Sequence, residues 1–372
     1  MKINISREEL VQGVQTIQYS LSSRTTLPIL LNFLMETENN QVKVISTDLE
    51  MGVKHYIKAE IKNDGAITIP AKKFSDILHS LPDAEDIELA VDAGGKISLK
   101  CGRSRFSIVG SPKSEYPVLP DFNKANAFEI SAGAVAGMVK KTIFAASSDE
   151  TRHVLNGVFW SAKNGILEMV ATDGRRLAAC AKKIIPKEKE FAIIVPTKVL
   201  SELLRLIGLF EGVEGYDDKM LVSVTENQIT FQFKGTTILS RLVGGVFPNY
   251  EQVIPTKREI ILTADTKNLL AVTKRASLCA VDRGGSVKYA LKKEILHVTA
   301  SSQNNEFNED LAVDYAGSDF TVAFKPQFVV DALKHVDSEK VTIAMTSPVN
   351  PALVEPVGGE GDYRFVVMPM RL

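Results

Sequence analysis

One unit of sequence occurs three times along this chain of 372 residues, and this repeat restricts the fold more than any other feature. A proline followed by a short amphipathic stretch recurs at Pro70, Pro196 and Pro326, so the prolines stand 126 and then 130 residues apart. A second marker, an apolar stretch with a small polar end, recurs at 44–48, 169–173 and 297–301, with spacings of 125 and 128. Because two independent markers have nearly the same period, the sequence predicts three tandem copies of one structural unit.

Each unit is predicted to contain two helices and an antiparallel sheet. Ser6, Ser131 and Asp265 are suitable N-caps for the first helix of each unit. The three prolines are expected at the first turn of the second helix, where a missing N–H costs nothing. The remaining residues alternate between apolar and polar with the period of two that is typical of strands, as in 87–91 and 97–101. The expected fold class is therefore α+β.

Domain boundaries are expected in two stretches that contain prolines and asparagines, 119–127 and 247–258. The sequence therefore predicts three domains, at 1–125, 126–254 and 255–372.

The composition argues against an enzyme, a metalloprotein and a membrane protein. The net charge is −1, and the longest apolar run, 27–35, is too short to span a bilayer and is interrupted by Pro28 and Asn32. No glycine-rich segment matches a phosphate loop, and no Gly-x-Ser-x-Gly elbow occurs in the sequence. The cysteines and histidines stand without disulfide or metal-site spacing: Cys101, Cys180, Cys279, His55, His79, His153, His297 and His335. We expect a cytoplasmic protein with no catalytic residues, no metal and no cofactor.

Three features remain informative, and each has a simpler structural alternative. The segment 172–178 contains an Asp-Gly pair that is typical of a hairpin turn. The segments 247–250 and 368–372 are apolar, and they could be only a linker and a frayed end. Basic residues recur near the helices of all three units, although most charged helical residues belong to a solvated face. These residues are Arg24, Lys72, Lys73, Lys140, Lys141, Arg152, Lys198, Lys267, Lys274, Arg275, Arg283 and Lys334.

At these segments the chain resembles the beta subunit of bacterial DNA polymerase III, the sliding clamp, and the resemblance extends over its whole length. The matching motifs are Arg-Thr-Thr-Leu-Pro-Ile-Leu at 24–30, Thr-Asp-Leu-Glu-Met at 47–51, Gly-Arg-Ser-Arg-Phe-Ser at 102–107, Leu-Asn-Gly at 155–157, the segment 172–178, and the terminal Met-Pro-Met-Arg-Leu. Together the motifs are highly specific. The resemblance implies a head-to-tail homodimer in which six domains close a ring, with helices lining the hole and sheets outside.

A ring that slides needs an attraction to phosphate that is independent of sequence, so the resemblance implies duplex DNA as a partner. It implies DNA-facing positions at Arg24, Arg152, His153 and Lys198, and the repeated basic residues add Lys73, Lys141, Lys274 and Arg275. Family members often have an aromatic pair just before Leu155, where this chain has His153 and Val154.

The resemblance also implies an apolar pocket between the second and third domains. A replicative polymerase, a clamp loader and other proteins with a clamp-binding motif would use this pocket in turn. The implied pocket residues are Leu155, Thr172, Gly174, Arg175, Arg176, Leu177, Pro248, Gln252, Val253, Phe328, Val366, Met368, Pro369, Met370 and Arg371. Two positions depart from the common pattern, since an arginine is frequent at Gln252 and a histidine at Arg175.

For the dimer interface, the resemblance implies that Phe106 and Ile108 of one subunit meet Leu278 and Cys279 of the other. Two other classes of protein remain as alternatives. A repeat scaffold would bind peptides through the surface formed by 172–178 and 368–372 without encircling DNA. A hydrolase would require a convergent acid–base or metal cluster, which the sequence does not supply.

Overall fold

The computed structural model describes residues 1–21, 25–82, 85–211, 217–280, 285–358 and 362–371. These residues form two compact units, each built from segments that are distant in the sequence. Unit 1 comprises Met1–Gly133 and Lys198–Leu242, and unit 2 comprises Ala134–Thr197 and Val243–Leu372. The middle repeat therefore contributes strands to both units.

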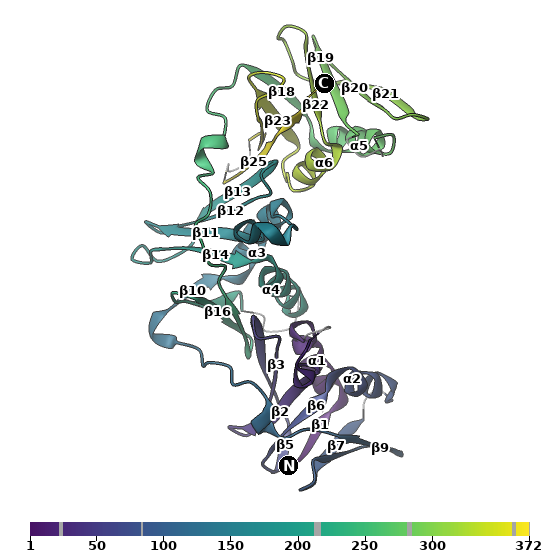
Figure 1. The fold of residues 1–372 in the computed structure, drawn as a ribbon, viewed down its shortest axis with the longest axis vertical. Coiled ribbons are helices and arrows are strands. Elements are labelled where there is room, and N and C mark those ends of the chain that lie inside the picture. Colours follow the sequence, from purple (N-terminus) through teal and green to yellow (C-terminus); the bar gives the residue numbers. More distant parts are fainter. Residues whose placement is uncertain (22–24, 83–84, 212–216, 281–284, 359–361, 372) are drawn as a thin grey trace. The chain divides into compact units, whose positions relative to one another are not determined.

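Unit 1 contains two antiparallel sheets, and its described α-helices are labelled in Figure 1. Its helices are α1 (Arg7–Ile17), α2 (Ala71–Ser80) and α4 (Thr197–Phe210). The five-stranded sheet has the order β5 (Glu60–Asn63), β1 (Lys2–Ser6), β7 (Asp86–Val91), β8 (Lys96–Cys101) and β9 (Ser104–Val109). The eight-stranded sheet has the order β10 (Ala127–Ser131), β15 (Lys219–Val224), β16 (Gln228–Phe233), β17 (Thr236–Arg241), β4 (Met51–Ile57), β3 (Gln41–Thr47), β2 (Asn32–Glu38) and β6 (Ala66–Pro70).

Unit 2 repeats this plan. Its helices are α3 (Ala132–Thr142), α5 (Thr266–Ser277) and α6 (Pro326–Lys334). The eight-stranded sheet has the order β14 (Phe191–Pro196), β11 (Gly157–Lys163), β12 (Ile166–Thr172), β13 (Arg176–Lys183), β25 (Tyr363–Val367), β24 (Ala352–Pro356), β23 (Lys340–Met345) and β18 (Ile260–Asp265). The five-stranded sheet has the order β21 (Glu306–Ala312), β20 (Ile295–Ser301), β19 (Val287–Lys292), β22 (Phe320–Phe324) and β26 (Pro369–Met370). None of the described helices is long and apolar enough to cross a membrane.

The first helix of each repeat begins where the sequence predicts. Ser6 Oγ accepts the N–H of Glu9 at 3.2 Å, and Asp265 Oδ1 accepts the N–H of Asn268 at 2.8 Å, so both are side-chain N-caps. In the middle repeat, the Asp218 carboxylate accepts the N–H of Gly133 at 2.6 Å, at the start of α3. The apolar face of α1 is buried against the sheet as the spacing of its residues predicts.

The third repeat is displaced by one residue from the alignment that the sequence markers predict. Pro70 ends β6 and is the N-cap of α2, and Pro196 ends β14 directly before α4. Pro326, in contrast, is the first residue of α6, and its N-cap is Lys325. Proline suits either place, because the N–H that it lacks has no helical partner there. The counterpart of Pro70 is therefore Lys325, and the spacings become 126 and 129 residues. The hairpins give the same alignment. In each repeat one strand begins directly after an equivalent two-residue turn, and the first residues of these strands are Gln41, Ile166 and Ile295.

Each eight-stranded sheet joins two consecutive repeats at a seam. At seam 1, in unit 1, β17 pairs with β4 and Ile238 stands opposite Val53. At seam 2, in unit 2, β25 pairs with β13 and Phe365 stands opposite Ala178. The hairpin registers make Ile238 the counterpart of Phe365 and Val53 the counterpart of Ala178. The two seams therefore have the same register.

Candidate functional site

The turn 172–176, which joins β12 to β13, is held together by its own side chains. Thr172 Oγ1 donates to the carbonyl of Arg176 at 2.6 Å and accepts the N–H of Gly174 at 3.0 Å. Asp173 Oδ1 accepts the N–H groups of Arg175 and Arg176 at 2.9 and 3.1 Å. Gly174 has a φ of +84°, a conformation that glycine adopts without strain. The predicted turn is confirmed, and it leads directly into the buried Leu177.

Arg176 is turned away from solvent and fastens this turn to α6. Its Nε donates to Asp173 at 3.1 Å, and its Nη1 donates to Asp331 of α6 at 2.6 Å. The guanidinium carbon also lies 4.8 Å from the ring centre of Phe328 and 5.6 Å from that of Phe144. Arg176 and Phe328 therefore support the turn through contacts with α6. The sequence did not single out Asp331, because nothing in its spacing relates it to a turn some 155 residues earlier.

An apolar cluster beside the turn contains three of the predicted pocket residues, Leu155, Leu177 and Val366. Leu155 ends the 3-10 helix Glu150–Leu155, and Leu177 and Val366 face each other across seam 2. Phe247 belongs to the same cluster, and its ring stacks on that of Phe159 with ring centres 5.0 Å apart. Residues from four separate segments thus form one continuous apolar wall within unit 2.

The C-terminal segment follows Val366 of this wall and is not frayed in the residues that the structure describes. The Met368 N–H donates to the carbonyl of Arg175 at 2.9 Å, which ties the segment to the turn. Pro369 and Met370 then form β26, which pairs with β22. Met368 is 36% exposed. Arg371 is exposed, and Leu372 lies outside the described residues.

The linker between β17 and β18 provides the more exposed members of the predicted pocket. Pro248 is exposed directly after the buried Phe247. Gln252 and Val253 lie on the 3-10 helix Glu251–Val253, and Val253 is 44% exposed. Tyr250 fixes this linker, because its hydroxyl donates to Glu168 of β12 at 2.7 Å. Burial together with this bond raises the pKa of Tyr250 well above its usual range, which keeps the hydroxyl protonated as a donor.

Seam 1 carries the same turn but a different wall. Thr47 Oγ1 donates to the carbonyl of Met51 at 2.8 Å, and Asp48 Oδ1 accepts the Met51 N–H at 2.8 Å. The backbone N–H of Arg241 donates to the carbonyl of Glu50 at 2.9 Å, as that of Met368 does to the carbonyl of Arg175 at seam 2. At seam 1, therefore, a charged pair stands where seam 2 has Arg175 and Met368. Gly52 is the counterpart of Leu177, and a Cβ on it would lie 2.6 Å from Leu119 Cδ1. The two seams thus share the Thr-Asp turn but differ beside it, since the side chain of Leu119 lies next to Gly52 at seam 1 and Leu177 is part of the apolar wall at seam 2.

Four of the predicted DNA-facing cations lie beside a carboxylate. Lys141 Nζ bonds Asp337 at 2.7 Å and lies 3.6 Å from the ring centre of Tyr363, with 19% of its side chain exposed. The pairs of the other three are Arg152 with Asp149 at 3.7 Å, Arg275 with Glu309 at 2.8 Å, and Lys198 with Asp48. Although burial would raise the pKa of Asp337, the bonds from Lys141 and the Tyr363 hydroxyl lower it. The bonds between Arg275 and Glu309 raise the pKa of the former and lower that of the latter.

The remaining predicted DNA-facing residues that the structure describes are exposed. Lys73 lies on α2, Lys274 lies on α5, and His153 lies on the 3-10 helix before Leu155. Arg24 lies outside the described residues.

The predicted dimer residues lie at or near two outermost strands. Phe106 and Ile108 belong to β9, which stands last in the five-stranded sheet of unit 1. In unit 2, β21 stands first in its sheet, and Leu278 and Cys279 follow the C-terminal end of the neighbouring α5. Leu278 is 72% exposed, and Cys279 is half-buried. In the repeat, β9 is the counterpart of β17 and β25, and β21 is the counterpart of β4 and β13.

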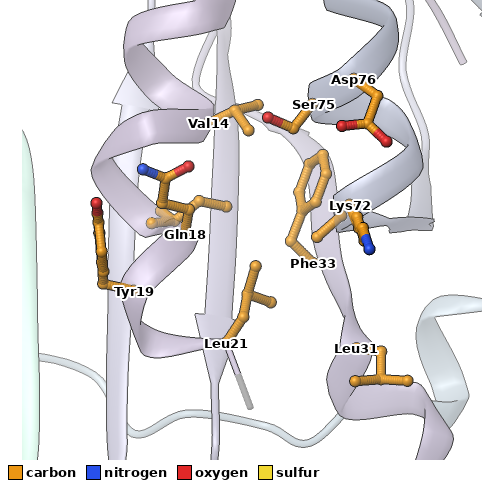
Figure 2. A pocket seen from close by; sticks show the side chains of 11 residues that line it. Val14, Gln18, Tyr19, Leu21, Leu31, Phe33, Lys72, Ser75 and Asp76 are labelled. Carbon is orange, nitrogen blue, oxygen red and sulfur yellow. The ribbon is translucent and has the colours of Figure 1, made fainter. Parts of the chain in front are cut away.

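A cavity of about 670 Å³ lies between α1 and α2 in unit 1. Figure 2 shows that its lining is mainly apolar and that Phe33 points into the space between the two helices. Its ionisable side chains are those of Lys72 and Asp76, which share one turn of α2, and Tyr19. This lining offers shape and apolar surface but no arrangement of nucleophile and base. Among the described residues, no three His, Cys, Asp or Glu side chains form a cluster that could hold a metal ion.

Comparison with known proteins assigns each repeat to one part of the same family. Residues 1–120, 129–249 and 251–371 match, in order, the N-terminal, central and C-terminal domains of the DNA polymerase III beta subunit. A curated relative, the beta sliding clamp of Haemophilus influenzae, is 30% identical over 374 residues and covers all of both chains.

Solved structures of similar proteins have the same fold. The crystal structure of the DNA polymerase III subunit beta from Pseudomonas aeruginosa matches with a TM-score of 0.93 at 30% identity and covers all of both chains. The DNA polymerase sliding clamp from Bacillus subtilis matches with a TM-score of 0.94 at 27% identity, covering 100% of this chain and 99% of that one. The expected α+β fold of three tandem clamp domains is thereby confirmed.

Proposed function

We propose, since the chain belongs to the DNA polymerase III beta subunit family, that it is a non-catalytic sliding clamp that encircles duplex DNA and tethers a replicative polymerase. The observation that carries this proposal is the match of all three repeats, in order, to the three domains of the family. We place the domains at 1–125, 126–254 and 255–372, and the protein in the cytoplasm, where it meets chromosomal DNA.

The ring would close by pairing β9 of one subunit with β21 of the other. Seams 1 and 2 already join the counterparts of these strands in a common register. The same register would bring Phe106 opposite Phe307 of the partner subunit. The strands carry opposite charges, because Arg103 and Arg105 belong to the β8–β9 hairpin and Glu306, Glu309 and Asp310 lie on β21. These features support a head-to-tail homodimer, in which each end of one chain meets the opposite end of the other.

Seam 2 also supports the contact predicted for Leu278. In the repeat, Phe144 is the counterpart of Leu278, and Phe365 is the counterpart of Phe106. Phe144 packs against Phe365 with ring centres 5.6 Å apart, and it stacks on His335 at 4.4 Å. By the same arrangement, Leu278 would pack on Phe106 of the partner subunit. The exposed leucine would then become part of a third seam.

The apolar wall at seam 2 would bind the short peptides of a polymerase, a clamp loader and other partners. Leu155, Leu177 and Val366, which belong to one apolar cluster, would form its base, and the exposed Val253 and Met368 would form its rim. A methionine adapts its shape to different partners, so one pocket suits several peptides in turn. The exposed Arg175 and Gln252 lie where they would tune the preference for polar peptide residues.

The phosphate contacts would be supplied by Arg24, Lys73, Arg152, His153, Lys198, Lys274 and Arg275. The burial of Lys141 against Tyr363 makes it a weaker candidate than the exposed lysines.

Topological binding distinguishes a clamp from a peptide-binding scaffold. The protein should remain on nicked circular DNA after loading and leave it when the circle is linearised. Retention on linear DNA without blocked ends would refute encirclement. Peptide binding is a separate test, because Leu177→Ala should weaken a clamp-binding peptide by at least about tenfold through loss of the buried wall. Normal binding by this variant would refute the pocket assignment but not the clamp.

A further inference from the structure

We propose that Asp48 weakens the contact of Lys198 with DNA phosphate, and that such carboxylates keep the attraction of the clamp for DNA low enough for sliding. This inference rests on the proposed function. Lys198 is the second residue of α4, its side chain is 55% exposed, and its ammonium group contacts Asp48 Oδ2. Both residues belong to unit 1.

Asp48 is the fixed member of this pair. Its Oδ1 accepts the N–H groups of Glu50 and Met51 at 3.0 and 2.8 Å, and its side chain is only 10% exposed. The turn therefore holds the carboxylate in place with Oδ2 directed at the lysine. Lys198, in contrast, has a long flexible stem and lies mostly in solvent. The lysine can leave for a phosphate, but the carboxylate cannot follow it.

A phosphate that approaches Lys198 must replace a negative charge that is already present. The contact therefore gains less electrostatic free energy than a contact with an unpaired lysine, although an exposed ion pair is weak enough to be exchanged. An unpaired cation also releases a counterion from the DNA when it binds, whereas a paired one releases less net charge. Asp48 thus reduces both the affinity of this contact and its dependence on salt.

The same arrangement occurs at other predicted DNA-facing cations. Arg275 is 50% exposed and is bonded to Glu309, and Arg152 lies 3.7 Å from Asp149. A ring is retained by topology and needs no tight grip on phosphate. Strong contacts would instead have to be broken at each step along the duplex. Paired cations would accordingly attract DNA through many weak phosphate contacts, none of which is strong enough to stop the clamp at one position.

The test compares Asp48→Asn with Asp121→Asn in the full-length protein. Asparagine keeps an oxygen for the two turn N–H groups and removes only the charge. Asp121 pairs with Lys54 of β4 at 3.1 Å and is fully exposed, so its variant changes the net charge equally at a different place. Binding to a fluorescent duplex is measured by anisotropy between about 20 and 150 mM salt, with thermal melting of each variant.

Asp48→Asn should bind about twofold to fivefold more tightly at low salt, with a salt slope steeper by up to about 0.9, and Asp121→Asn should behave as the wild type. The gain should vanish in the double variant Lys198→Gln with Asp48→Asn. Equal binding by Asp48→Asn and wild type would overturn the inference. So would an equal gain in Asp121→Asn, because net charge alone would then explain it.

A second comparison separates this inference from the proposed function. Lys73→Gln and Lys198→Gln should each weaken binding if these lysines face DNA. If neither does so, the proposed DNA surface is wrong and the inference falls with it. If both do so while Asp48→Asn has no effect, only the role of Asp48 is refuted.

Discussion

Arg176 Nη1 lies 2.6 Å from Asp331 Oδ2, and this bond joins the turn 172–176 to helix α6. Both side chains are mostly buried, at 15% and 17% exposure. A buried ion pair whose members also donate and accept further bonds is costly to break, because one charge is left without compensation. Asp331 forms no part of the apolar wall, so its effect on a bound peptide must act through Arg176.

Asp331→Asn should therefore weaken a clamp-binding peptide by about threefold to tenfold, because the turn spends less time in its binding conformation. Stopped-flow measurements should find a slower association rate with little change in dissociation. Lys334→Ala is the matched control, because Lys334 lies 4.0 Å from the same carboxylate and should not affect binding. A faster dissociation rate in Asp331→Asn would instead indicate that Asp331 contacts the peptide.

Substitutions at Gly174 and Leu49 should have opposite effects on the free energy of unfolding, because these residues occupy the same position in the turn that the two seams share. Both have positive φ values, +84° and +77°, at the same position of the turn. Gly174→Ala should lower the free energy of unfolding by about 1 kcal/mol, because the left-handed conformation strains any residue with a Cβ. Space is not the cause, since the nearest atom to that Cβ is Arg152 Nη1 at 3.5 Å.

Leu49→Gly should raise the free energy of unfolding by about 0.5 kcal/mol, because the relief of strain exceeds the added flexibility of the unfolded chain. Denaturant titration of both variants checks the pair. If both changes destabilise the protein equally, strain at this position is not the governing factor.

Much of the architecture could be predicted from the sequence because helix caps and turns depend on residues that are close together in the chain. Ser6 and Asp265 cap helices where the spacing indicated, and Asp173 serves the hairpin turn that the Asp-Gly pair indicated. The third repeat was misaligned by one residue, because a proline suits both the N-cap and the first helical position. Local pattern alone could not separate these two places.

The site was less accessible to sequence reasoning, because its energetics depend on contacts between distant segments. Basic residues are recognisable by type, but the carboxylate beside each is not. Lys141 illustrates this, since its two partners, Asp337 and Tyr363, come about 200 residues later in the sequence. The difference between the two seams also depends on Leu119, a linker residue that covers Gly52.

His55 should make the stability of unit 1 depend on pH. Its imidazole is buried beside Phe210 and bonded to Thr236 across seam 1 at 2.8 Å, and burial lowers its pKa to about 4. In the unfolded chain it titrates near 6.5, so protonation favours unfolding as the pH falls from about 6.5 to about 4. The full loss is about 3 kcal/mol. Thermal melting of wild type and His55→Gln between pH 7 and 4 should show a smaller decline in the variant. Parallel declines would exclude His55 as the cause.

Leu278 offers the sharpest test of the dimer, because it is 72% exposed and a charge there should not disturb the fold of one subunit. Leu278→Asp should convert a dimer into a folded monomer, since a carboxylate would be buried against Phe106 of the partner subunit without a counter-charge. Val349→Asp is the matched control, because Val349 is 65% exposed in a turn after β23, outside the proposed third seam. Sedimentation equilibrium gives the mass of each variant, and thermal melting establishes that it is folded.

The monomeric variant should still bind a clamp-binding peptide at seam 2, which lies within one subunit, but it should no longer be retained on circular DNA. A Leu278→Asp protein that remains dimeric at micromolar concentration would show that the ring, if it forms, closes through another surface.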